Sequence, residues 1–244
     1  MRWKKNGFLV HRWLALVVSV QLLAWSVGGF TFSILDIENV RGELDMERGA
    51  EPALELDTVR VSPLEAIQSL SDGSGLSTAV RKVVLRERRG RVVYELFGVK
   101  GEPLASIDVT TGEVTRQIGE REAGGAAVAD FAHEATVSSI ELLEGSPPVE
   151  YRGGRMPVYR VVLDHPKHPH FYVCPVTGEI LKRRNKLWRI FDFFWMLHIM
   201  DYGERNSFNH WLLTGMSVLA IATSISGLVL WSWRLRGVFR RPAT

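Results

Sequence analysis

Histidines are the residues whose type and position in this chain point most directly to chemistry. Seven occur among 244 residues, and His11, His198 and His210 fall in or beside long apolar stretches. An ionisable side chain is costly inside a membrane and is usually kept there for a function. Because neutral imidazole is the usual axial ligand of b-type haem, these three histidines are candidate cofactor-binding residues.

Depth in the membrane decides which of these histidines can share one haem. His11 stands at the basic start of the first apolar stretch, whereas His198 and His210 lie near the far side, twelve residues apart. About 20 helical residues, rising ~1.5 Å each, separate the two levels by roughly 30 Å. We therefore expect His198 and His210 to be able to meet, while His11 needs a second ligand from another chain, such as His11 of a twin. A structural role, as an interfacial or helix-start histidine, is the alternative for each.

A second group of histidines, His165, His168 and His170, falls within six residues. Such a group can bind a divalent metal. No carboxylate or cysteine with the spacing of a closed site accompanies it, so a solvated loop is the favoured interpretation and a metal site the alternative. The sequence also lacks a phosphate loop, a dinucleotide fingerprint and a Ser-His-Asp order. Whether the chain is an enzyme is left open, and any reduction would use electrons handed in by a partner.

Two uncharged runs of 23 residues, at 13–35 and 211–233, must position these histidines. Each exceeds the ~20 residues that cross a bilayer as a helix. A third apolar stretch, 187–203, is too short and too charged for a span, and its aromatic residues favour a helix at the membrane interface. The single cysteine, Cys174, excludes a disulfide scaffold.

Basic residues without acids flank both runs, and short flanks of this kind mark the cytoplasmic side. They are Arg2, Lys4, Lys5, Arg12, Arg234, Arg236, Arg240 and Arg241. We therefore predict a protein of the bacterial inner membrane with both termini in the cytoplasm and residues 36–209 in the periplasm. The net charge of +3 is then explained by membrane topology and is not a signal for nucleic acid.

The segment between the runs contains an internal repeat. Thr-Gly-Glu occurs at 111–113 and 177–179, an offset of 66, and Tyr94 and Tyr159 recur at an offset of 65. Near-equal offsets indicate duplication, each copy being one helix and a small antiparallel sheet. In the first copy we expect a helix over 64–70 and strands over 79–87, 91–98 and 103–109. In the second we expect mainly helix over 126–143 and strands over 158–163 and 170–174.

The predicted organisation is an α+β membrane protein in which two transmembrane helices flank the pair of repeats. Its parts are the basic tip and first transmembrane helix (1–35), an acidic, extended linker (36–61), repeat 1 (62–118), repeat 2 (119–186), the interfacial helix (187–203), the second transmembrane helix (208–233) and a basic tail (234–244).

These motifs together resemble a known family. The helix and strands that close in Thr-Gly-Glu resemble the PepSY domain, present here twice. The flanking spans resemble the PepSY-associated transmembrane helices, on the strength of His-Arg-Trp-Leu at 11–14, Leu197-His198, Gly203 and Ser-Gly-Leu-Val-Leu-Trp at 226–231. Larger members of that family have four or more spans, and some are haem-containing ferrisiderophore reductases with histidine ligands in their spans.

The resemblance implies a small haem b electron-transfer or reductase subunit that passes electrons to ferric iron or a ferric siderophore in the periplasm. Because this chain has two spans, the resemblance also implies a homodimer or a partner membrane subunit. The alternative comes from PepSY units of protease propeptides and cell-wall proteins. It is a non-enzymatic, membrane-anchored module that docks or regulates a periplasmic protein.

Overall fold

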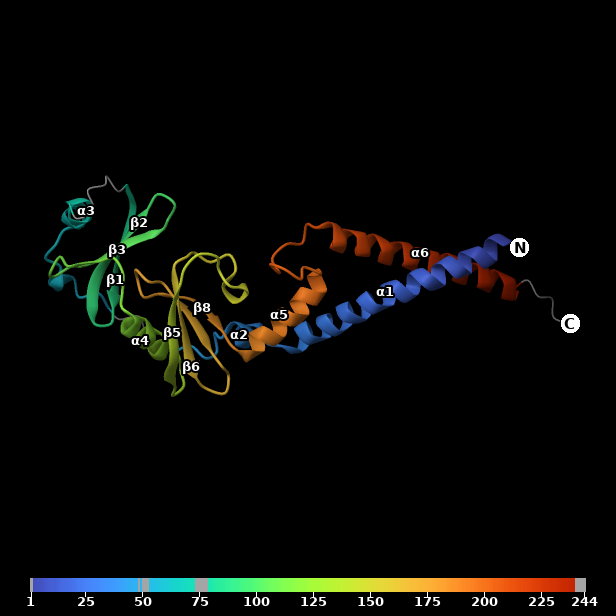
Figure 1. Cartoon of the computed structure of the whole chain (residues 1–244), viewed down its shortest axis with the longest axis horizontal. Helices are drawn as coiled ribbons and strands as arrows, with labels where there is room; N and C mark the ends of the chain where they lie inside the picture. Colours follow the sequence, from blue (N-terminus) through green and yellow to red (C-terminus); the bar gives the residue numbers. More distant parts are fainter. Residues whose placement is uncertain (1, 48, 50–52, 73–78, 240–244) are drawn as a thin grey trace. The chain divides into compact units, whose positions relative to one another are not determined.

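The computed structural model describes residues 2–47, 49, 53–72 and 79–239 (Figure 1). The chain divides into a helical unit, which takes in the residues up to Val40 and from Leu187 onward, and a double-sheet unit, Arg41–Lys186. Long apolar helices and antiparallel sheets are both present, so the predicted α+β class is confirmed.

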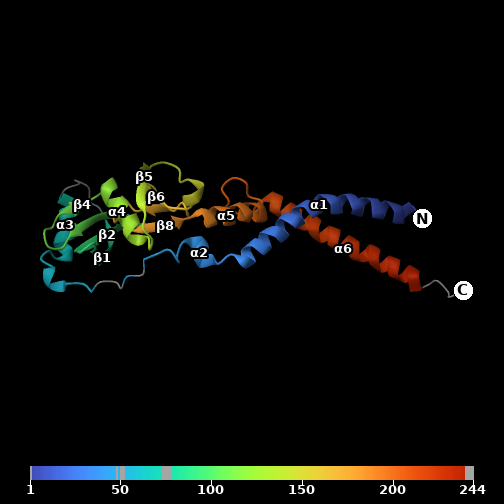
Figure 2. The ribbon, with the colours of Figure 1, turned by 90° about the horizontal axis from the view of Figure 1, so that it is seen from below.

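The helical unit contains α1 (Arg2–Ile34), most of the short α2 (Ile37–Arg41), most of α5 (Lys186–Ile199) and α6 (Trp211–Phe239). α1 packs against α6, and the start of α1 lies at the same end of this unit as the end of α6 (Figures 1 and 2). Two helical stretches, Asn6–Ile34 and Trp211–Leu235, are long and apolar enough to cross a membrane. Apolar side chains on them stand open, such as Leu23 at 65% and Leu228 at 66% exposure. Surface of this kind is stable against lipid or a partner helix and not against water.

The acidic segment that follows α1 was predicted to be an extended linker, and this is wrong in part. It contains a short helix, α2 (Ile37–Arg41), and a 3₁₀ turn, Leu56–Thr58. Between them Met46 forms an antiparallel bridge with Phe131. The bridge attaches this part of the chain to the second repeat, because its backbone groups are hydrogen-bonded to that repeat instead of to water.

The first repeat of the double-sheet unit contains α3 (Pro63–Asp72), β1 (Val80–Arg88), β2 (Arg91–Gly98), β3 (Pro103–Asp108) and β4 (Val114–Thr115). The strands form one antiparallel sheet in the order β1-β2-β3-β4. α3 begins with a capping box, in which Ser62 Oγ accepts from Glu65 N–H and Glu65 accepts from Ser62 N–H at 2.7 Å. Ala66 and Leu70 of α3 then pack on the apolar face of the sheet.

The second repeat contains α4 (Glu120–Asp130), β5 (Thr136–Leu143), a 3₁₀ turn (Val149–Tyr151), β6 (Val158–Asp164), β7 (His170–Val173) and β8 (Ile180–Arg184). Its sheet has the order β5-β6-β7-β8. The prediction of a helix over 126–143 is therefore wrong: α4 ends at Asp130 and β5 follows. Thr136 and Val137 are β-branched, and β5 pairs along its length with β6, so tertiary pairing selects the strand.

The two Thr-Gly-Glu turns are structurally equivalent, and this supports the duplication. Each turn joins the third and fourth strands of its sheet, and Gly112 and Gly178 have φ values of +76° and +72°. The N–H of each glycine donates to a carbonyl four residues earlier, at 2.9 Å in both turns. Glycine is required here because this left-handed backbone disfavours a side chain.

Candidate functional site

The end of α5 determines the role of His210. The carbonyls of Leu197, His198 and Ile199 have no partner further along the helix, as at any helix end. They accept hydrogen bonds from Gln21 Nε2 (3.0 Å), Trp25 Nε1 (2.8 Å) and His210 Nε2 (2.9 Å), respectively. The other ring nitrogen of His210, Nδ1, faces the N–H of Leu213 at 3.4 Å. His210 thus connects α5 to the start of α6, and both of its ring nitrogens are engaged.

His198 has a different environment. Its Nδ1 is buried and forms no hydrogen bond to any residue in the described part of the chain. Phe32 meets the ring edge-on, with centroids 5.7 Å apart, and Trp25 lies 6.4 Å away. Gly28 of α1 faces Nδ1, because a Cβ at that position would stand 3.9 Å from it. An unpartnered nitrogen in such a place calls for an explanation, and ligand binding is one.

His11 is held in one orientation by α6. Its Nδ1 lies 2.8 Å from Ser226 Oγ, and that hydroxyl donates to the carbonyl of Thr223, also at 2.8 Å. Since the hydroxyl has one hydrogen, its oxygen accepts from His11, which places the proton on Nδ1 and a lone pair on Nε2. Gly227 lies against the ring, and a Cβ there would be 3.2 Å from Cε1 and 3.7 Å from Nε2. The glycine therefore leaves the Nε2 edge of the ring uncovered.

His11 also lines a hollow on α1 of about 640 Å³. The other lining residues are Phe8, Leu9, Arg12 and Ala15. The hollow thus offers an imidazole, a guanidinium and apolar surface together. These are groups that fit a planar apolar cofactor with acidic substituents, such as haem b, and the uncovered Nε2 lone pair beside Gly227 is suited to a metal.

Two histidines of the second group, His165 and His170, contact different partners. The ring of His165 stacks on His133 with centroids 5.4 Å apart, and His170 Nδ1 lies 2.8 Å from Glu150 Oε2. Within the described ranges, no group of three or more His, Cys, Asp or Glu side chains is arranged to hold a metal ion. The metal site at His165, His168 and His170 stays a prediction.

Asp45 is the centre of a polar cluster that the sequence did not reveal. Its side chain is 8% exposed, and its Oδ1 contacts His133 Nε2 at 2.8 Å and Lys167 Nζ at 2.5 Å. Burial raises the pKa of Asp45, but the hydrogen bonds and charges of Lys167 and His133 outweigh it and hold the pKa below its usual value. The cluster fastens the segment before Met46 to the second repeat.

This pKa shift predicts a pH-dependent contribution to stability. A carboxyl whose pKa is lower when folded stabilises the fold above its unfolded pKa and loses that effect as the pH falls through the folded value. We expect Asp45→Asn to cost about 1–2 kcal/mol of unfolding free energy at neutral pH. The cost should begin to fall below about pH 4 and vanish only below the lowered pKa of the folded state. Urea unfolding of both proteins at neutral pH and at about pH 3 measures this. An equal cost at both pH values would contradict the assignment.

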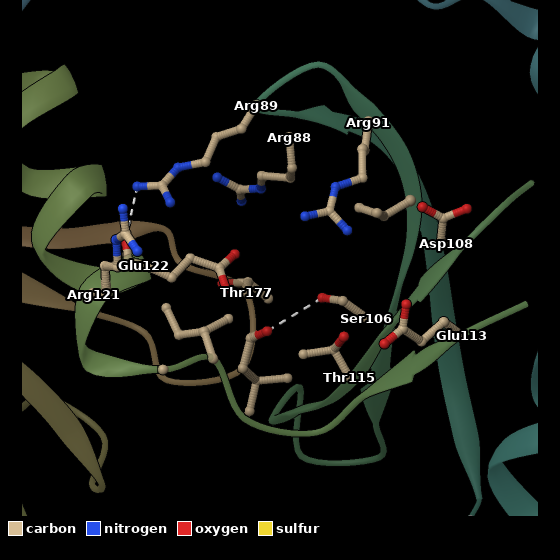
Figure 3. A pocket seen from close by; sticks show the side chains of 14 residues that line it. Arg88, Arg89, Arg91, Ser106, Asp108, Glu113, Thr115, Arg121, Glu122 and Thr177 are labelled. Atoms are coloured by element: carbon tan, nitrogen blue, oxygen red, sulfur yellow. Dashed lines mark hydrogen bonds between the residues drawn. The ribbon is translucent and has the colours of Figure 1, made fainter. Parts of the chain in front are cut away.

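A polar pocket of about 540 Å³ lies within the double-sheet unit, between the first sheet and the start of α4 (Figure 3). Arg88, Arg89 and Arg91 reach it from the β1–β2 hairpin, and Arg121 reaches it from α4. Ser106 also lines the pocket and donates to the carbonyl of Val176 at 3.2 Å. A neighbouring pocket of about 390 Å³, lined by Cys174 and by both apolar and charged residues, shares Val176 and Thr177 with it.

The sequence pattern predicted the turn at Gly90, but it did not predict that the arginines around this turn line a pocket. The signal was present, because four of the six residues from 86 to 91 are arginines. Charge runs of this kind are usually solvated, so only the fold shows that three of them line one cavity. Comparison with protein-family models, curated proteins and solved structures gives no match for this chain. The PepSY resemblance therefore stays a prediction.

Proposed function

We propose that this chain is a small membrane subunit that binds haem b and takes part in electron transfer across the bacterial inner membrane. The observation that carries the proposal is His11, whose tautomer is fixed by Ser226 and whose Nε2 edge is left uncovered by Gly227. Haem-ligating histidines are oriented in this way, with the second nitrogen donating to a neighbour. His11 and Ser226 are the first residues of the two motifs that resemble PepSY-associated helices, 11–14 and 226–231, and they are in contact.

The residues around His11 have distinct parts in this proposal. Ser226 orients the imidazole, Arg12 supplies a cation for acidic substituents, and Phe8 and Leu9 supply apolar surface. Haem, once bound, supplies one-electron exchange. Because Phe8, Leu9 and Arg12 lie with His11 on α1, a second histidine that holds the haem would come from His11 of a second copy. The acceptor in the proposal is ferric iron or a ferric siderophore in the periplasm, with both termini cytoplasmic.

An optical spectrum of the protein purified in mild detergent, oxidised and then reduced with dithionite, tests this proposal. We expect the sharp bands of a low-spin b-type haem at about one haem per two chains. His11→Ala should abolish the bands, whereas His210→Ala should keep them, because His210 already binds a backbone carbonyl. Bands that survive His11→Ala but not His198→Ala would move the site to His198. A colourless protein, expressed with haem precursor present, would refute the proposal.

A membrane-anchored binding module without haem is the second candidate function. The observation that favours it is the arginine-lined pocket, which lies in the double-sheet unit and is independent of the membrane histidines. In this candidate the two apolar helices are anchors, and the repeats dock a periplasmic protein. A colourless protein that crosslinks to one periplasmic partner would support it.

A further inference from the structure

We propose that the pocket between the β1–β2 hairpin and α4 is a binding site for a small oxyanion, a carboxylate or a phosphate. The inference goes beyond the proposed electron transfer and does not depend on haem. Its basis is the convergence of arginines, the start of a helix and an unusual turn on one cavity of about 540 Å³.

The charges of the pocket favour an anion at one end. Asp108 and Glu113 lie at the end near Arg91, away from Arg89 and Arg121 (Figure 3). The Asp108 carboxylate already accepts the N–H groups of Thr110 and Thr111, each at 2.9 Å.

At the other end Arg88 is paired with Glu95, a buried carboxylate outside the cavity lining. Arg89 and Arg121 form no salt bridge to any residue that the structure describes, and Glu122 is the one acid that lines the pocket beside them. Guanidinium groups bind carboxylate and phosphate oxygens in pairs, so two of them at one end form a suitable cradle.

The start of α4 adds backbone donors to the same end. Gly119 is the N-cap and has no side chain with which to cap the helix. The N–H groups of Glu122 and Ala123 both turn back to the Gly119 carbonyl, at 3.0 Å. The first N–H groups of a helix otherwise lack partners, and together they favour negative charge. Gly119, Arg121 and Glu122 all line the pocket.

The β1–β2 turn supplies a third, independent observation. Arg89 and Gly90 are its two central residues, with φ values of +53° and +77°. Asn or Asp is the usual residue before glycine in such a turn, and arginine is strained there. The turn carries Arg89 across to α4, where Nη2 donates to the Glu122 carbonyl at 2.6 Å. Strain kept at a cavity wall is typical of a binding residue.

A substitution in the turn is expected to weaken anion binding without lowering the stability of the fold. Arg89→Asn removes the charge but places a favoured residue in the turn, so stability should be kept or increased. Titration calorimetry of the full chain in detergent, with citrate and with inorganic phosphate as probes, should show saturable binding of at least one of them. We expect Arg89→Asn and Arg121→Gln each to weaken it about tenfold or more, and added salt to weaken it further.

The matched control is Arg60→Asn, because Arg60 is exposed and does not line this pocket. Its affinity should stay within about twofold of the unchanged protein. The proposal is overturned if neither probe binds at about 10 mM, or if the control weakens binding as much as Arg89→Asn. Binding of citrate alone would identify a carboxylate ligand, and binding of phosphate alone a phosphate ligand. Neither result depends on whether the protein carries haem, so this inference and the proposed function fail separately.

Discussion

Replacing Arg88 with Met is expected to lower the unfolding free energy of the double-sheet unit by about 3 kcal/mol. Glu95 on β2 is 1% exposed, and Arg88 Nε donates to its Oε1 at 2.8 Å. Removing the arginine leaves the buried carboxylate with the long 3.9 Å contact to Arg86 in place of a close pair, which costs more than the pair itself contributes. Chemical unfolding followed by far-UV circular dichroism measures the loss.

Arg86→Met is the matched control for this experiment. Arg86 is two residues away on the same strand, but it is 47% exposed and its Nε lies 3.9 Å from Glu95 Oε2. An exposed pair at this distance contributes about 0–1 kcal/mol. Adding Glu95→Gln to Arg88→Met should recover part of the stability, because it removes the buried charge. Equal losses from Arg86→Met and Arg88→Met would show that Glu95 does not depend on Arg88.

Replacing Gly227 with Val is expected to remove haem from the purified protein. A Cβ at position 227 would already lie 3.2 Å from Cε1 of His11, and the two further methyl groups of valine need more room. The ring would have to leave Ser226, so its orientation and the uncovered Nε2 edge are lost together. Haem per chain, quantified after purification, should fall to near zero.

Gly215→Val controls for valine in the same helix, because a Cβ on Gly215 meets nothing within 4 Å. We expect this variant to retain haem. A readout without haem is the thermal unfolding midpoint in detergent, which Gly227→Val should lower more than Gly215→Val, since overpacking typically costs about 1–3 kcal/mol. Equal midpoints and equal haem contents would mean that His11 does not pack on Gly227 as described.

Most of the repeat architecture was predictable from local patterns. Strand β2 was expected at 91–98 and spans Arg91–Gly98, because it alternates between glycine-marked turns. The wrong prediction of a helix over 126–143 has two causes. Small residues such as Ala126 and Ala127 favour a helix locally, and α4 does form there, up to Asp130. The strand β5 that follows is selected by its pairing with β6, a contact between residues distant in the sequence.

The membrane histidines show what a sequence leaves undecided. Their position in or beside apolar stretches was evident from the sequence. The sequence did not show that His210 caps α5 through Ile199 while His11 binds Ser226. A histidine that caps a helix and one that is free to bind a ligand have the same local pattern, so only their partners distinguish them.

By itself, the sequence determined the two apolar runs, the basic flanks and the duplication marked by Thr-Gly-Glu. Each is a property of contiguous residues or of a fixed period, and hydrophobic length and turn chemistry act at that range. Only the tertiary structure decided which groups meet: His11 with Ser226, 215 residues apart, Asp45 with Lys167, 122 apart, and Arg89 with α4. Contacts at such separations arise from the packing of helices and sheets, and packing depends on all the surfaces at once.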